Sequence, residues 1–250
     1  MKSLTLNDLL YKNVTSRISI KINVRPERKK DMGIRNLTID QIRQRIESFD
    51  YSYVQDWSTW VTVRRDYPFD HTPPEFGRIL RRWQACRPNT MRRCRADATH
   101  EAPYLEDLLN DALSAAAALD GFDLSQANSM NEVVENALQE LWAIFRNLSY
   151  SGRCRNGLAG VVGISKAALL ITEGRVGPAF DSMVRRRLAT GAIPTAGSWI
   201  ENLKKIADDI NQFQQANRCT LREVVPSSYS GLHNGRLYDM ILGPGTPDLV

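Results

Sequence analysis

The residues of this chain that are best suited to chemistry lie in one stretch, GLAGVVGISKAALLITEGRVGPAFDSMVRR, residues 157–186. Three glycines precede or open an apolar helix that carries one lysine, Lys166, and a lone aspartate, Asp181, comes after it. Glycines let a backbone approach a partner closely, and the free amides at a helix N-terminus can hold an anion. Together with the helical pattern before Gly152, the stretch predicts a helix, a glycine-bearing hairpin and a second helix.

These residues resemble the helix-hairpin-helix DNA glycosylase superfamily. That family places a small residue four positions after the second hairpin glycine, as in Gly163 and Ala167, and a catalytic aspartate after the next helix, as in Asp181 with the following SMVRR. The match covers residues 157–186, and it departs from the family pattern because Gly160 lies three positions before Gly163 instead of two. The resemblance implies a hydrolase that cleaves N-glycosidic bonds in double-stranded DNA and needs no cofactor.

Strand-cleaving members of that family carry a lysine two positions after the second glycine. This chain has Ser165 at that position and Lys166 one step later. The resemblance therefore implies a monofunctional DNA glycosylase, which removes a damaged or chemically modified base and leaves the backbone intact. Such an activity would serve repair or defence against modified foreign DNA. The hairpin residues Gly160, Gly163, Ser165 and Lys166 are then expected to contact DNA.

An arginine-rich segment precedes this stretch. Seven arginines fall between Arg78 and Arg95, a density that could neutralise several phosphates. We expect DNA contacts from Arg78, Arg82, Arg92 and Arg93. The alternative is an ordinary solvated helix face, because the apolar residues among these arginines have helical spacing and force their neighbours outward.

Asp181 has two interpretations. Cleaving an N-glycosidic bond develops positive charge on the sugar, which a carboxylate can stabilise or use to orient water. The same residue also fits the N-cap of a helix that begins at Ser182, and one aspartate can fill both roles. The base must leave the stack and enter a pocket, for which Trp142 and Tyr150 are the candidates.

A second class of function stays open, in which the chain is a non-catalytic helical module that binds DNA or a protein partner. Under that alternative Asp181 is only a cap. Near the C-terminus, Arg236 and Asp239 offer another charged pair, which we interpret as a buried ion pair that closes the fold.

The chain has 250 residues, 42% hydrophobic and 24% charged, with a formal net charge of +5, as expected of one globular domain or two helical lobes. Four cysteines and three histidines are scattered without metal-ligand spacing, which predicts no metal site and reduced thiols. The N-terminus lacks the uninterrupted apolar run of a signal peptide, and no stretch is long enough to span a membrane. We therefore expect a cytoplasmic location.

The periodicity of the chain predicts a mainly α, bundle-like fold. Thr38 with Gln41, and Ser129 with Glu132, have the spacing of capping boxes before amphipathic segments. Residues 198–215 place apolar side chains on one helical face. Short strands are expected only near the N-terminus: residues 17–24 alternate like a strand, and residues 57–68 fit a second strand or an extended loop.

Overall fold

Helices build the regular structure of this protein, of which a computed structural model describes residues 33–87, 90–97, 102–150 and 157–247. Helical residues make up 65% of this part, which contains no strand, so the predicted mainly α fold is confirmed. The strand expected at 17–24 lies outside the described residues. The α-helices are α1 (Ile39–Ser48), α2 (Tyr51–Asp66), α3 (Thr72–Arg82), α4 (Leu105–Ala117), α5 (Glu132–Arg146), α6 (Val161–Ile171), α7 (Ser182–Arg187), α8 (Ala196–Asn217), α9 (Leu221–Val224) and α10 (Asn234–Leu242). Short 3₁₀ turns are η1 (Phe69–His71), η2 (Arg95–Asp97), η3 (Leu124–Ser129) and η4 (Ser227–Tyr229).

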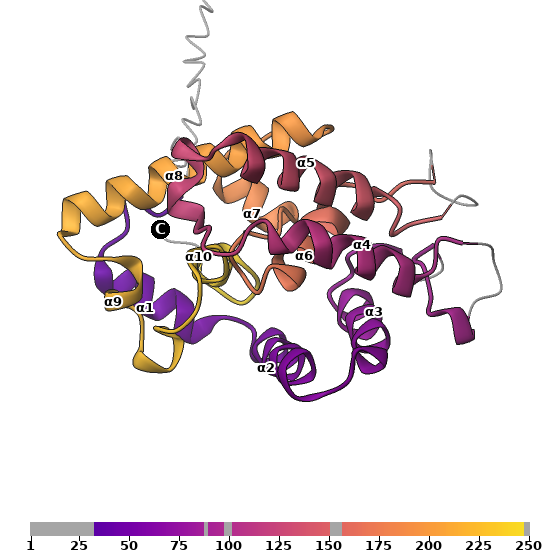
Figure 1. Ribbon diagram of the computed structural model, residues 1–250. Coiled ribbons are helices and arrows are strands. Elements are labelled where there is room, and N and C mark those ends of the chain that lie inside the picture. The colour runs from indigo at the N-terminus through magenta and orange to yellow at the C-terminus, as the bar shows by residue number, and fades with distance from the viewer. Residues whose placement is uncertain (1–32, 88–89, 98–101, 151–156, 248–250) are drawn as a thin grey trace, which may run out of the picture.

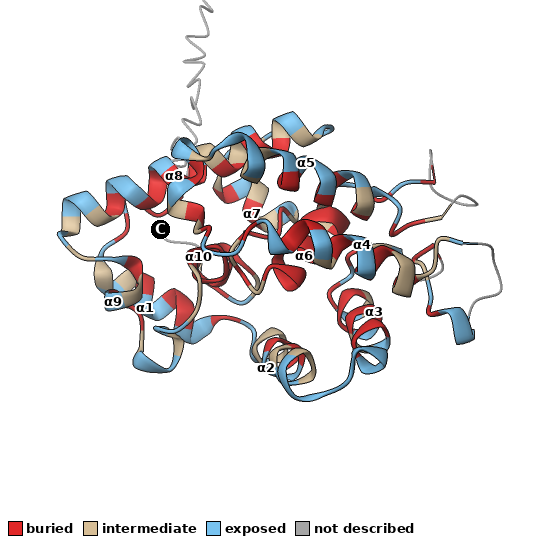
Figure 2. Ribbon diagram, viewed as in Figure 1, coloured by how far each residue is buried: buried red, intermediate tan, exposed pale blue. Residues whose placement is uncertain are grey.

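Helix α6 lies at the centre, with α3, α4 and α5 packed against it (Figure 1). Every residue of α6 except Val162 is buried, so this helix is enclosed by its neighbours on all sides (Figure 2). Helix α8 packs along α5 and η3, while α10 packs against α1, α7 and α9. The buried apolar side chains form one cluster that runs from Ile34 to Leu242.

The N-termini of α1 and α5 show how well capping residues in the sequence predict where a helix begins. Thr38 and Gln41 form the predicted capping box of α1, with bonds of 3.2 and 2.9 Å. The box predicted at Ser129 is wrong, because that residue ends η3, and Asn131 caps α5 instead through its side chain and the Val134 amide. Both segments are helical as predicted, and only the start of α5 differs.

Residues 57–66 were expected as a strand or an extended loop, and the structure corrects this, because they belong to α2. Asp50 caps this helix by accepting from the Ser52 amide at 2.9 Å. Trp57 and Trp60 lie on its buried face, and the Trp60 indole donates to Leu170 O on α6 at 2.8 Å. Burial of two large rings outweighs the weak helix propensity of the β-branched residues in this segment.

Candidate active site around Asp181

Asp181 is the N-cap of α7, and its Oδ1 accepts hydrogen bonds from the amides of Met183 and Val184, each at 2.9 Å. Its second carboxylate oxygen, Oδ2, has no hydrogen-bond or ion-pair partner among the described residues. The side chain is half-buried. Asp181 therefore caps α7 with one oxygen, and the other oxygen takes no part in the cap.

The segment that carries Asp181 is tied to two helices by its backbone amides. The Phe180 amide donates to Ser165 Oγ on α6 at 2.8 Å, and the Ala179 amide donates to Asp239 Oδ1 on α10 at 2.9 Å. A Cβ on Gly177 would lie 2.6 Å from Gly235 O, so the backbones meet without room for a side chain. These contacts fix where the Asp181 carboxylate lies relative to α6.

Lys166 follows Ser165 on α6 and lies in the interior. The side chain is 4% exposed, and Nζ donates to the backbone oxygen of Trp83. Burial lowers the pKa of Lys166, while the negative charges of Asp181 and Asp239 oppose that shift. The expected contact between Lys166 and a surface phosphate is corrected, because the ammonium does not reach the surface.

Tyr53 on α2 packs near Lys166 and Trp83. Its ring stacks on Trp83, with centroids 5.2 Å apart, and Lys166 Nζ lies 6.0 Å from the Tyr53 centroid. Burial, together with the carboxylates of Asp181 and Asp239, raises the pKa of Tyr53 to about 12. A phenol is protonated at neutral pH even at its ordinary pKa, so this hydroxyl is a hydrogen-bond donor there.

The predicted ion pair near the C-terminus is confirmed. Arg236 and Asp239 are 2.7 Å apart, with side chains 1% and 6% exposed. The Arg236 guanidinium also lies 4.6 Å from the centroid of Trp57 and 5.6 Å from that of Trp83. Burial raises the pKa of Asp239 and lowers that of Arg236, but their direct contact favours both charges. The pair closes the fold behind Asp181, because Asp239 also holds the Ala179 amide.

Two of the arginines expected at a DNA surface are engaged within the protein. Arg78 and Arg82 donate to the buried Asp56 carboxylate at 3.0 and 3.1 Å, and Arg78 also pairs with Glu75 at 2.7 Å. The Trp83 indole donates to the other Asp56 oxygen at 3.0 Å. Both arginines are about half-exposed, but their charges are partly compensated. Through Asp56, both arginines connect α3 to α2 within the protein itself.

Arg92 and Arg93 lie beside the connection between α5 and α6. The Arg92 amide donates to Leu148 O at 2.7 Å, and the Tyr150 amide donates to Thr90 O at 2.9 Å, so the two segments run side by side. The Arg92 guanidinium lies 5.5 Å from the Tyr150 ring centroid. Arg93 is exposed. The structure thus brings these arginines together with the flank of the expected hairpin, of which residues 151–156 lie outside the described part.

The hairpin glycines have different surroundings. Gly160 is the exposed N-cap of α6 and has open space around it. Gly163 is buried, and a Cβ there would lie 2.9 Å from Ala85 O and 3.0 Å from the Cys86 sulfur. The structure therefore places Gly163 in the packing of α6 against the chain after α3. It corrects the expected DNA contact of Gly163, and that of Ser165, which is 2% exposed.

The two residues expected in a base pocket lie in different surroundings, and a pocket role stays a prediction for Tyr150. Trp142 on α5 is 5% exposed and packs against Trp199 on α8, with centroids 5.7 Å apart, so it is a core residue. Tyr150 lies against Arg92 beside the hairpin.

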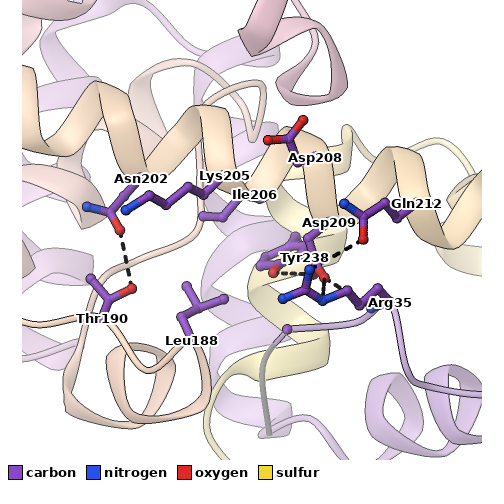
Figure 3. A pocket seen from close by; sticks show the side chains of 11 residues that line it. Arg35, Leu188, Thr190, Asn202, Lys205, Ile206, Asp208, Asp209, Gln212 and Tyr238 are labelled. Atoms are coloured by element: carbon purple, nitrogen blue, oxygen red, sulfur yellow. Dashed lines mark hydrogen bonds and ion pairs between the residues drawn. The ribbon is translucent and has the colours of Figure 1, made fainter. Parts of the chain in front are cut away.

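A separate cavity of about 210 Å³ lies against α8 and does not include Asp181 or its neighbours (Figure 3). Its floor holds Asp209, which accepts from the Ile34 and Arg35 amides at 2.6 and 3.1 Å and from the Tyr238 hydroxyl at 2.7 Å. Burial raises the pKa of this carboxyl. Because these bonds satisfy Asp209, we interpret it as the anchor that holds residues 33–35 on α8.

The sequence itself contains a signal for the surroundings of Tyr53 and of Asp209, although neither residue belongs to a motif. Tyr53, Trp57 and Trp60 repeat at helical spacing, which predicts that Tyr53 faces the same interior side as both tryptophans. Asp209 falls on the apolar face of α8, between Ile206 and Ile210, where a carboxylate needs partners. The position of Lys166 beside Tyr53 had no such signal.

Comparisons with family models, with curated proteins and with solved structures found no match to this chain. Across the described residues, no helix combines the length and apolar character that a membrane crossing requires. The same part of the chain contains no group of three or more acidic, histidine or cysteine side chains arranged for a metal ion. The arrangement of residues around Asp181 is therefore the basis for the function proposed below.

Proposed function

We propose that this protein is a monofunctional DNA glycosylase that removes a damaged or chemically modified base, with Asp181 as its catalytic residue. The observation that carries the proposal is the unpartnered Oδ2 of Asp181, in a half-buried carboxylate whose backbone is tied to α6 and α10. The amides of Phe180 and Ala179 make these ties, which hold the Asp181 carboxylate in one position.

The chemistry asked of Asp181 is electrostatic. The bond between C1′ and the base nitrogen breaks with its electron pair leaving on the base, and the sugar becomes cationic. A water oxygen then bonds to C1′ and loses a proton, while the base gains one from solvent. Asp181 Oδ2 stabilises the cationic sugar or orients the water, and partial burial strengthens this interaction.

The DNA contacts of this proposal come from the hairpin region. Arg92 and Arg93 lie beside Leu148 and Tyr150, which follow α5, and the exposed Gly160 forms the N-cap of α6. We expect the arginines and this helix end to contact phosphates. Arg78 and Arg82 contribute less, because Asp56 already compensates their charge. Extrusion of the base from the stack costs a few kcal/mol, which these backbone contacts help to offset.

A non-catalytic DNA-binding module is the second candidate, and one observation favours it. Asp181 Oδ1 accepts from two amides of α7, which alone accounts for an aspartate at this position. The two candidates therefore differ in whether the negative charge of Asp181 is needed.

Asp181→Asn separates these roles, because asparagine caps a helix about as well as aspartate but carries no charge. The assay uses duplex oligonucleotides that each hold one oxidised, deaminated, alkylated or hydroxymethylated base. Released base appears as alkali-sensitive breaks, and samples without alkali report direct strand cleavage. We expect the wild type to leave an intact backbone and Asp181→Asn to lose at least about 100-fold in rate.

Asp40→Asn is the matched control, because it removes an exposed carboxylate of α1. We expect it to excise base at the wild-type rate, and both variants to bind DNA and melt like the wild type. Normal excision by Asp181→Asn would leave the residue as a cap alone. No release from any duplex, with retained DNA binding, would favour the module. A covalent complex trapped by borohydride would contradict the monofunctional assignment.

A further inference from the structure

Polar side chains gather where α9, α10 and the start of η3 meet. Arg222 Nη2 on α9 lies 3.2 Å from Oδ2 of Asp123, which is the N-cap of η3. The same nitrogen lies 3.2 Å from Nδ1 of His233, which is the N-cap of α10. Asn234, the first residue of α10, donates from Nδ2 to Asp123 Oδ1 at 2.6 Å. One guanidinium nitrogen therefore joins α9 to both η3 and α10.

The contact between Arg222 and His233 requires a neutral imidazole. A guanidinium has only donors, so Nδ1 of His233 must accept the hydrogen bond with its lone pair. Protonation replaces that lone pair with an N–H and brings two positive charges to a separation of 3.2 Å. The N-terminus of α10 also carries partial positive charge, which disfavours a cation at its N-cap. A protonated His233 is therefore incompatible with this position of Arg222.

The other contacts of this cluster leave Arg222 free to respond. Asp123 Oδ1 already accepts from the Ser125 amide at 3.0 Å and from the Ser125 hydroxyl at 2.7 Å, so only Oδ2 serves Arg222. Arg222 Nε is buried and has no hydrogen-bond partner among the described residues. The Arg222 side chain is 42% exposed, which gives the guanidinium a route into water. Without the contact to His233, Arg222 is left with the Asp123 contact alone.

The charges that face His233 come from three parts of the chain: Arg222 on α9, Asp123 at η3, and Glu173 and Arg175 after α6. Burial lowers the pKa of His233, and the two arginines lower it further against the opposing carboxylates. The unfolded chain therefore takes up this proton at a higher pH than the folded protein does. The free energy of unfolding should fall as pH drops below the unfolded pKa of about 6.5, until the folded pKa is passed.

We propose that His233 is a pH-sensitive switch, which holds Arg222 against Asp123 while its imidazole is neutral and releases the Arg222 side chain when it is protonated. Leu221 and Val224 stay buried in the core, so the change loosens the polar side of α9 without unfolding this helix. The inference does not depend on the proposed glycosylase function.

Nuclear magnetic resonance tests the switch on the intact chain. A titration of the imidazole signals gives the pKa of His233, and relaxation of the Arg222 side-chain nitrogens reports whether the guanidinium is held. We expect His233 to titrate below about 6.5 in the wild type, with Arg222 ordered above the measured pKa and mobile below it. Arg222→Met should raise the pKa of His233, because it removes the facing cation and leaves Asp123 Oδ2 to the imidazole.

His233→Gln is the variant without the switch, because its amide oxygen accepts from Arg222 at every pH. We expect Arg222 to stay ordered in this variant, and its urea midpoint to fall clearly less than that of the wild type between the two conditions. His71→Gln is the matched control, since it removes an exposed histidine of η1 and should keep the wild-type response.

Three results would overturn the proposal. The first is a His233 that titrates at or above about 6.5, or that stays neutral until acid unfolds the protein. The second is a wild-type Arg222 side chain that is equally mobile on both sides of the His233 pKa, or a His233→Gln variant that responds to pH as the wild type does. The third is a His233 pKa that Arg222→Met leaves unchanged, because the shift would then come from burial alone.

Discussion

Ser165→Ala removes the hydroxyl that joins α6 to the segment of Asp181. Ser165 Oγ lies 2.8 Å from the Phe180 amide and donates to Val161 O at 2.7 Å. Phe180 is fully buried, so its amide would be left without a partner and out of reach of water. An unsatisfied buried donor costs about 1 to 3 kcal/mol, and we expect the free energy of unfolding to fall by about 2 kcal/mol.

Urea denaturation followed by circular dichroism measures this loss. With a slope of about 3 kcal/mol/M, a loss of 2 kcal/mol lowers the midpoint by about 0.7 M. Hydrogen exchange reports the local effect, because the Phe180 amide should lose protection more than the amides of α8. Ser230→Ala is the control: its exposed hydroxyl bonds only to Ser227 O, and we expect a change within about 0.5 kcal/mol.

Ser165→Ala should slow base excision more than it weakens DNA binding. The hydrogen bond between Ser165 and the Phe180 amide positions Asp181 but is buried, away from any DNA-binding surface. A loss of about 10-fold in the single-turnover rate is expected, since small displacements of a catalytic group are costly. Two results would refute the reasoning. One is a midpoint equal to that of Ser230→Ala, and the other is full excision activity in a protein whose Phe180 amide exchanges freely.

Three other predictions follow from the contacts. Arg236→Met should lower the free energy of unfolding by about 3 to 5 kcal/mol in urea denaturation, because it leaves Asp239 buried without its counter-ion. Burial opposes the shift, but hydrogen bonds from η3 and α10 lower the pKa of Asp123 in the folded protein. The ionised carboxylate therefore stabilises the fold above the unfolded pKa of about 3.9, and this stabilisation is lost as pH falls through the lower folded pKa. Asp123→Asn should make the free energy of unfolding depend less on pH in this acidic range. An unchanged pH dependence would contradict the role given to Asp123. The double variant with Arg92→Ala and Arg93→Ala should bind duplex DNA more weakly in fluorescence anisotropy. The slope of the logarithm of the binding constant against the logarithm of the salt concentration should decrease in magnitude by about 2, and an unchanged slope would show that neither arginine contacts DNA.

The sequence by itself determined the helices whose signals are local. The capping box at Thr38 and the apolar face that includes Ile206 and Phe213 specify α1 and α8, because both depend on residues three or four positions apart. Residues 57–66 show the limit of such signals. Their composition favours a strand, but burial of Trp57 and of Trp60, whose indole donates to Leu170 O on α6, makes them a helix.

The same division holds at the candidate site. Asp181 as an N-cap and Arg236 with Asp239 as an ion pair were predicted from neighbouring residues, and both are confirmed. The burial of Lys166 and its position near Tyr53 and Trp83 were decided only by the packing of α2 and α6 around α3. A sequence states which residues share a helical face, but contacts between helices far apart in the chain depend on how their side chains fill the space between them.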